Sequence, residues 1–127
     1  MPVTTPGNWL DMPQTAGDWH YSGGLASFGQ PGAAPALTLR CDRAAGVVEL
    51  ARGGAGTGPM TIRTENGVRL VEAAPTATQL VARIAAQDPL LDAIAYSRGR
   101  FAVEVPGSAA LYIPAWPEVA RVIEDCR

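Results

Sequence analysis

Apolar and polar residues alternate one by one along several short stretches, which is the pattern of β-strands with one buried face. The clearest stretch covers residues 35–42, where Leu37, Leu39 and Cys41 fall on one face. One apolar and one polar face are expected of an antiparallel sheet whose outer side meets water. The same alternation predicts further strands at residues 19–21, 26–28, 47–52, 60–64, 68–71, 100–105 and 110–113.

Two dipeptides between these stretches predict tight turns. Gly23-Gly24 separates the first two strands, and Asn66-Gly67 separates the strands at 60–64 and 68–71. Asn-Gly favours a type I′ turn, in which both central residues have positive φ. Residues 78–85 fit either a strand or an Ala-rich helix. We favour a strand, because Asp88-Pro89 begins a separate helix directly afterwards.

Two short helices are predicted from helical spacing of apolar residues. Asp88 is a natural N-cap, Pro89 suits the first helical position, and Gly99 is expected to end the first helix. The second helix has Pro117 and Glu118 in its first turn. Its buried face follows the i, i+3, i+4, i+7 pattern. That face consists of Val119, Val122, Ile123 and Cys126.

The elements together predict a mainly β domain of the β-rich α+β class. A chain of 127 residues forms one ordinary domain. We expect an antiparallel β-sandwich or partly closed barrel of about eight strands, with one short helix crossing an end and the C-terminal helix packed on the sheet. Residues 1–16 contain three prolines and are interpreted as an extended N-terminal arm. Residues 17–127 form the single β-rich domain.

Cys41 and Cys126 are the two cysteines of the chain. The two-residue repeat places Cys41 on the buried face of its strand, and the helical repeat places Cys126 on the buried face of the last helix. A structural disulfide is therefore predicted, and such a bond is typical of an oxidising compartment. Two free thiols are the alternative.

Composition limits the classes of partner and the cellular location. The net charge of −2 gives no electrostatic reason to expect nucleic acid. No apolar run approaches the roughly 20 residues of a transmembrane helix. The first residues lack the basic start and apolar core of a signal peptide. This fits a cytoplasmic protein, or a chain whose secretion or lipoprotein leader has been removed. The loose polar lead-in and the cysteine pair favour the second, periplasmic or secreted, interpretation.

The sequence predicts no catalytic, cofactor-binding or metal-binding residues. His20 is the lone histidine, and the two cysteines are too far apart for a zinc motif. The glycine-rich run at residues 53–58 lacks the lysine of a phosphate-binding loop. An enzyme would have to use His20 with a nearby carboxylate or cysteine.

Six residues are candidates for a ligand or partner surface. Aromatic side chains gather near the N-terminus and could line a groove, or they could close one end of the β core. Two arginines flank Gly99 and could bind a carboxylate or phosphate, or they could form structural ion pairs. The candidates are Trp9, Trp19, Tyr21, Phe28, Arg98 and Arg100.

Residues 88–126 resemble small periplasmic domains of Alphaproteobacteria of the invasion-associated locus B type and related uncharacterised families. The shared pattern is a short helix at 90–94, a small-basic step at 98–101, a hairpin within 103–113, and a C-terminal helix ending in Cys126. Cys41 lies where such domains often supply the partner cysteine. The resemblance implies a secreted or periplasmic β-rich domain without established catalysis, and it transfers no functional residue.

These observations lead to two functional hypotheses. The first is a non-catalytic periplasmic or envelope-associated binding or accessory protein, whose partner is a protein or a small molecule. The alternative is a small hydrolase-like enzyme that uses His20. A homodimer formed through an edge strand is a further possibility.

Overall fold

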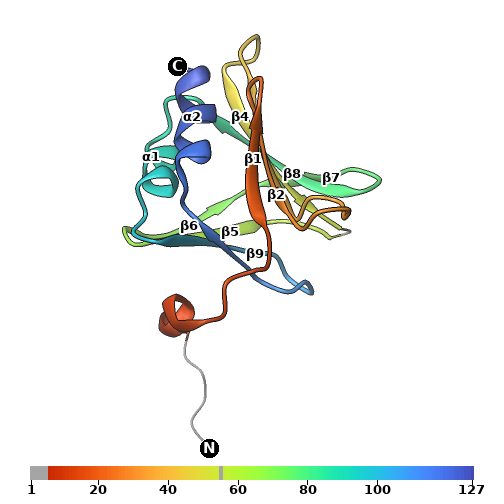
Figure 1. Cartoon of the computed structure of the whole chain (residues 1–127), viewed down its shortest axis with the longest axis vertical. Helices are drawn as coiled ribbons and strands as arrows, with labels where there is room; N and C mark the ends of the chain where they lie inside the picture. The colour runs from red at the N-terminus through yellow and green to blue at the C-terminus, as the bar shows by residue number, and fades with distance from the viewer. Residues whose placement is uncertain (1–5, 55) are drawn as a thin grey trace, which may run out of the picture.

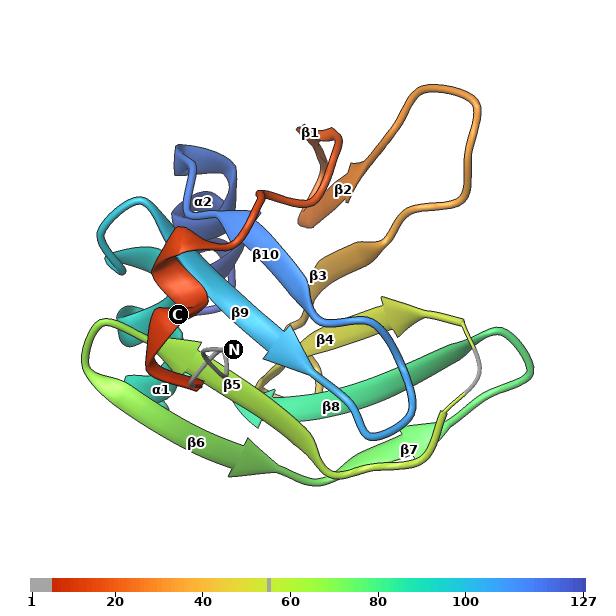
Figure 2. The same cartoon turned by 90° about the horizontal axis from the view of Figure 1, so that it is seen from below.

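Two antiparallel sheets pack together in the computed structural model, which describes residues 6–54 and 56–127 (Figures 1 and 2). The predicted β-sandwich is therefore confirmed, and the described residues do not form a closed barrel. The six-stranded sheet has the order β1-β2-β3-β4-β8-β7, and the four-stranded sheet has the order β10-β9-β5-β6. The strands are β1 (Asp18–Ser22), β2 (Leu25–Gly29), β3 (Leu37–Asp42), β4 (Val47–Gly53), β5 (Met60–Thr64), β6 (Gly67–Val71), β7 (Ala73–Pro75), β8 (Gln79–Ala85), β9 (Arg100–Glu104) and β10 (Leu111–Pro114).

The alternation of the sequence corresponds to the buried faces of the strands. Leu37 and Leu39 of β3 are fully buried, as are Met60 and Ile62 of β5. Residues 79–85 form β8, as we favoured, and β8 pairs with β4 along its whole length. The extra strand β7 was not predicted, because Ala73-Ala74-Pro75 carries no alternation and its pairing with β8 is a tertiary effect.

The hairpin between β5 and β6 forms as predicted, but its turn type was wrong. Thr64 pairs with Gly67, so the turn residues are Glu65 and Asn66, and no described non-glycine residue has positive φ. Of the four residues from Thr64 to Gly67, Gly67 alone has a positive φ, at +131°. The turn is held by its surroundings: the Glu65 amide donates to Ser97 Oγ at 3.1 Å, and Glu65 Oε1 accepts from the Arg98 amide. These contacts stabilise a turn at Glu65-Asn66 in place of the type I′ turn that Asn66-Gly67 favours.

The predicted extended arm was also wrong in part. Residues 1–5 lie outside the described part of the chain, but Pro6–Asp11 forms a short 3₁₀-helix. The following residues attach it to the four-stranded sheet. The guanidinium of Arg100 donates to the Met12 carbonyl, and the Thr15 amide donates to the Tyr112 carbonyl at 3.0 Å.

Strand β6 forms an exposed edge of the four-stranded sheet (Figure 2). Its apolar side chains Val68 and Leu70 are 53% and 63% exposed. The homodimer remains a prediction, for which β6 offers an unpaired edge.

Helix α1 (Pro89–Ala95) begins where the sequence predicted. The Asp88 carboxylate accepts a hydrogen bond from the Leu90 amide at 2.9 Å, which is an N-cap interaction. The same carboxylate forms a bidentate ion pair with Arg69. The hydrogen bonds from Arg69 lower the pKa of Asp88 below its ordinary value. The helix ends at Ala95, four residues before Gly99, and Tyr96 is its C-cap, so Gly99 belongs to the turn into β9 and does not cap the helix.

Helix α2 (Pro117–Asp125) packs on β1, β2 and β3, as predicted. Its side chains Val119, Val122 and Ile123 are buried in the core. Cys126 directly follows the helix and forms a disulfide with Cys41 of β3. The predicted bond is therefore present, and it fastens the carboxyl end of α2 to the six-stranded sheet.

Candidate functional site

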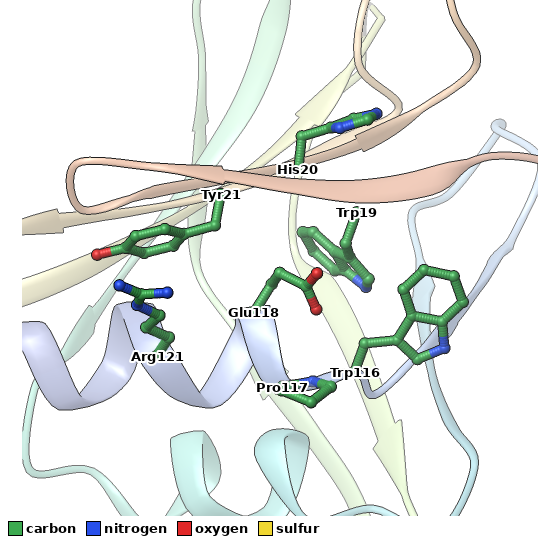
Figure 3. Close-up of a pocket in the computed structure, with 7 residues that line it drawn as sticks. All are labelled: Trp19, His20, Tyr21, Trp116, Pro117, Glu118 and Arg121. Carbon is green, nitrogen blue, oxygen red and sulfur yellow. The ribbon is translucent and has the colours of Figure 1, made fainter.

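A surface groove of about 580 Å³ lies between β1 and α2 (Figure 3). Trp19 and Tyr21 of β1 form one wall, while Trp116, Glu118 and Arg121 form the other. His20 and Pro117 complete the lining. We call this feature the β1–α2 groove. It combines aromatic rings with both signs of charge, a combination typical of binding sites.

The β1 wall is rigid because Trp19 is anchored at both its polar and its apolar atoms. Its indole Nε1 donates to the Pro114 carbonyl at 2.7 Å. Its ring makes an edge-to-face contact with Phe28, with 5.4 Å between the centroids. Such aromatic pairs add to the free energy gained from burial. Trp19 is 4% exposed and therefore forms the buried part of the β1 wall, not its rim.

Tyr21 connects β1 to α2 at the end of the groove that lies away from Trp116 (Figure 3). Its hydroxyl donates to the carboxylate of Asp125 on α2. The guanidinium carbon of Arg121 lies 4.3 Å from the centroid of its ring, in a cation–π contact (Figure 3). Both contacts fix the distance between β1 and α2.

The helical spacing of α2 determines which of its side chains line the groove. Because Val119 and Val122 face the core, Glu118 and Arg121 point up toward β1 from neighbouring turns (Figure 3). Trp116 stands just before the helix and is 38% exposed, so much of its ring is accessible. Glu118 is half-buried near the middle of the groove. Within residues 6–54 and 56–127, no group forms a hydrogen bond or ion pair with its carboxylate.

The carboxyl end of α2 is also tied to α1. Arg127 donates two hydrogen bonds to the Asp92 carboxylate, at 2.8 and 3.1 Å, and its Nε donates to the Ala86 carbonyl. The hydrogen bonds from Arg127 lower the pKa of Asp92. Together with the disulfide, these contacts fix α2 and therefore the groove.

Only two of the six candidate surface residues meet in this groove. Trp19 and Tyr21 line it, but Phe28 lies beneath Trp19 and is 0% exposed, so it offers no surface. The other three candidates lie outside the groove lining. Trp9 lies on the 3₁₀-helix, Arg98 follows α1, and Arg100 is bonded to the Met12 carbonyl.

Sequence reasoning missed Trp116, Glu118 and Arg121 as site residues. A signal for them was present, because the helical pattern placed Glu118 and Arg121 on the exposed face of a helix predicted to pack on the sheet. What could not be predicted was that β1 would lie opposite that face. β1 lies beside α2 because β1, β2 and β3 are adjacent in the six-stranded sheet and α2 packs on all three.

The enzyme alternative gains no support from these contacts. Cys41 is bonded to Cys126 and is not a free nucleophile. The imidazole of His20 is exposed and points to the opposite side of β1 from Glu118 (Figure 3). In the part of the chain that the structure describes, no carboxylate forms an ion pair with it.

A second groove, of about 630 Å³, lies along β7 and β8. Two of its charged residues are paired: Glu49 accepts from Arg40 at 2.8 Å, and Arg83 lies 3.3 Å from Asp42. Glu72 also lines this groove. The two grooves differ in their aromatic content: Trp19, Tyr21 and Trp116 line the β1–α2 groove, and none of the residues that line the second groove is aromatic. The β1–α2 groove is therefore the stronger candidate site.

Neither a metal site nor a membrane span is found in the described residues. No three histidine, cysteine, aspartate or glutamate side chains there are grouped to hold an ion. Among the described helices, none has the length and apolar character needed to cross a membrane. Comparisons with protein-family models, with curated proteins and with solved structures yield no match to this chain.

Proposed function

We propose that this chain is a non-catalytic binding protein of an oxidising, extracytoplasmic compartment, and that it binds its partner in the β1–α2 groove. The observation that carries the proposal is the groove itself. Accessible Trp116 directly precedes a helix whose carboxyl end is fixed by a covalent bond, and Glu118 in its first turn pairs with no described residue, so the site is formed before a ligand arrives. Preformed sites avoid part of the ordering cost of binding.

The disulfide supports the location. Bonds of this kind form and persist in the periplasm and outside the cell, while the cytosol keeps thiols reduced. The resemblance of residues 88–126 to periplasmic domains of the invasion-associated locus B type agrees with this placement. We therefore place the working form of the protein in the periplasm or among secreted proteins.

The location is tested by alkylating free thiols while the native cells are lysed, then unfolding and reducing the isolated chain. We expect Cys41 and Cys126 to be protected from the first reagent in nearly all molecules, because they form a disulfide. Two alkylated thiols would show that the chain works in a reducing compartment. A chain that was deliberately reduced before lysis is the control for complete labelling.

The binding site is tested by NMR with a panel of capped amino-acid amides that includes acidic, basic, aromatic and aliphatic members. We expect at least one member to shift the signals of Trp116 and Glu118 before those of other residues. Trp116→Ala should weaken that binding about tenfold or more, since exposed tryptophans are frequent binding hot spots.

Tyr96→Ala is the matched control, because Tyr96 is an aromatic residue, 70% exposed, that lies outside the groove lining. It should bind the same compound as tightly as the unmodified chain. Shifts confined to other surfaces, or no binding by any member of the panel, would contradict the proposed site.

A further inference from the structure

The β1–α2 groove carries a carboxylate, Glu118, that forms no ion pair with any described residue. Glu118 is half-buried between Trp19 and Arg121, and its carboxylate is directed into the groove (Figure 3). Arg121 is the nearest cation of the lining, but its distance from Glu118 exceeds that of an ion pair. A partly desolvated carboxylate gains most from a cationic hydrogen-bond donor.

The aromatic lining favours the same sign of charge. The face of an indole or phenol ring carries a negative quadrupole, which attracts cations and offers nothing to anions. Trp116 presents an accessible ring beside Glu118. A cation placed between them would gain from the ring and from the carboxylate together.

The molecule already makes one contact of this kind. Arg121 places its guanidinium carbon 4.3 Å from the centre of the Tyr21 ring, inside the same groove. This pair occupies one end of the groove and leaves Glu118 near the middle and Trp116 at the other end (Figure 3). The cation that would complete the site must therefore come from outside the described chain.

We propose, building on the function proposed above, that the β1–α2 groove binds an arginine side chain of a partner peptide, with its guanidinium stacked on Trp116 and hydrogen-bonded to Glu118. A guanidinium is planar and has paired donors, so it stacks on an indole and donates to both oxygens of a carboxylate. An ammonium group lacks the planar shape. The net charge of −2 of the chain is complementary to a basic partner.

The test measures the affinity of the intact, oxidised chain for N-acetyl-arginine amide by NMR titration. N-acetyl-citrulline amide is the uncharged probe of the same shape, and N-acetyl-lysine amide and choline are cations of other shapes. We expect the arginine probe to bind best. Equal binding of the citrulline probe would exclude recognition of charge, and equal binding of lysine or choline would exclude recognition of the guanidinium.

Two variants examine the assigned contacts. Glu118→Gln keeps the shape of the side chain and should weaken binding of the arginine probe about tenfold, as expected for the loss of a charge-assisted hydrogen bond. Arg121→Gln removes a like charge and should strengthen binding at low salt. An unchanged affinity in Glu118→Gln would overturn the proposal, as would a weaker affinity in Arg121→Gln when the NMR signals of Tyr21 and Trp116 show that the groove is retained.

The control variant is again Tyr96→Ala, which should bind the arginine probe normally. Thermal unfolding of each variant verifies that the fold is retained. If an acidic or aliphatic amide binds in the groove while the arginine probe does not, the arginine assignment fails and the proposed binding function stands. If no probe binds in the groove, both fail.

Discussion

The two helices are similar in size, but they are held in place by different means. Helix α1 has seven residues and a capping side chain, Asp88, that also pairs with Arg69. Helix α2 has nine residues and no side-chain cap, and its carboxyl end is joined to β3 by a disulfide. The start of α1 is thus fixed by a cap from the adjacent residue and by an ion pair to Arg69, 19 positions away. The placement of α2 depends on Cys41, a residue 85 positions away.

The largest expected effect comes from removing the covalent anchor of α2. Replacing Cys41 and Cys126 with alanine should lower the free energy of unfolding by on the order of 4 kcal/mol, because the unfolded chain regains the freedom of a long loop. Denaturation by urea at pH 7 measures this difference. The double variant should also lose binding in the β1–α2 groove, since α2 forms one wall.

Reducing the unmodified chain provides an independent measurement of the same effect. If reduction leaves both the unfolding midpoint and the groove binding unchanged, non-covalent packing is sufficient to hold α2. The stated difference between the helices would then disappear.

An intermediate effect is expected at the start of α1. Asp88→Ala removes the cap on the Leu90 amide and should cost about 1 kcal/mol of stability. Arg69→Gln is the matched control, because it removes the exposed ion pair and leaves the cap in place. It should cost less than Asp88→Ala, since exposed ion pairs contribute little. Equal losses in urea denaturation would show that the ion pair, and not the cap, holds α1.

The smallest effect on the stability of α1 is expected when the pH is lowered. The pKa values of Asp88 and Asp92 are lowered in the folded state by hydrogen bonds from Arg69 and Arg127. Their contribution to stability is therefore complete above the ordinary aspartate pKa, about 3.9, and is lost as the pH falls through the lower folded values. Amide hydrogen exchange should show α1 losing protection before α2, whose disulfide does not titrate.

The variant with Asp88→Asn and Asp92→Asn is the control for this prediction. It lacks the two carboxylates already at pH 7, so α1 should lose less further protection on acidification. Simultaneous loss of protection in both helices of the unmodified chain would contradict a difference in their anchoring.

Most of the fold could be predicted where one strong local pattern decided the structure. The alternation around Leu39 and Ile62 identified buried strand faces, and Asp88-Pro89 identified the start of α1. Predictions were wrong where tertiary contacts decided. Ser97 and Arg98 hold the turn at Asn66 in a conformation that its sequence does not favour.

The candidate site could be predicted only in part. Alternation placed Trp19 and Tyr21 on one face of β1, and helical spacing placed Glu118 and Arg121 on one face of α2. No local pattern states that these two faces oppose each other. That depends on the order of strands in the six-stranded sheet and on the bond from Cys126 to Cys41.

The hydrogen bond from Trp19 to the Pro114 carbonyl spans 95 positions of the chain. A ribosome therefore synthesises the Trp19 wall long before the helix that faces it. Until then, the ring surfaces of Trp19 and Tyr21 are uncovered, and the groove does not exist. In an exported chain, these rings would meet α2 only after translocation, where oxidation of the cysteines completes the fold.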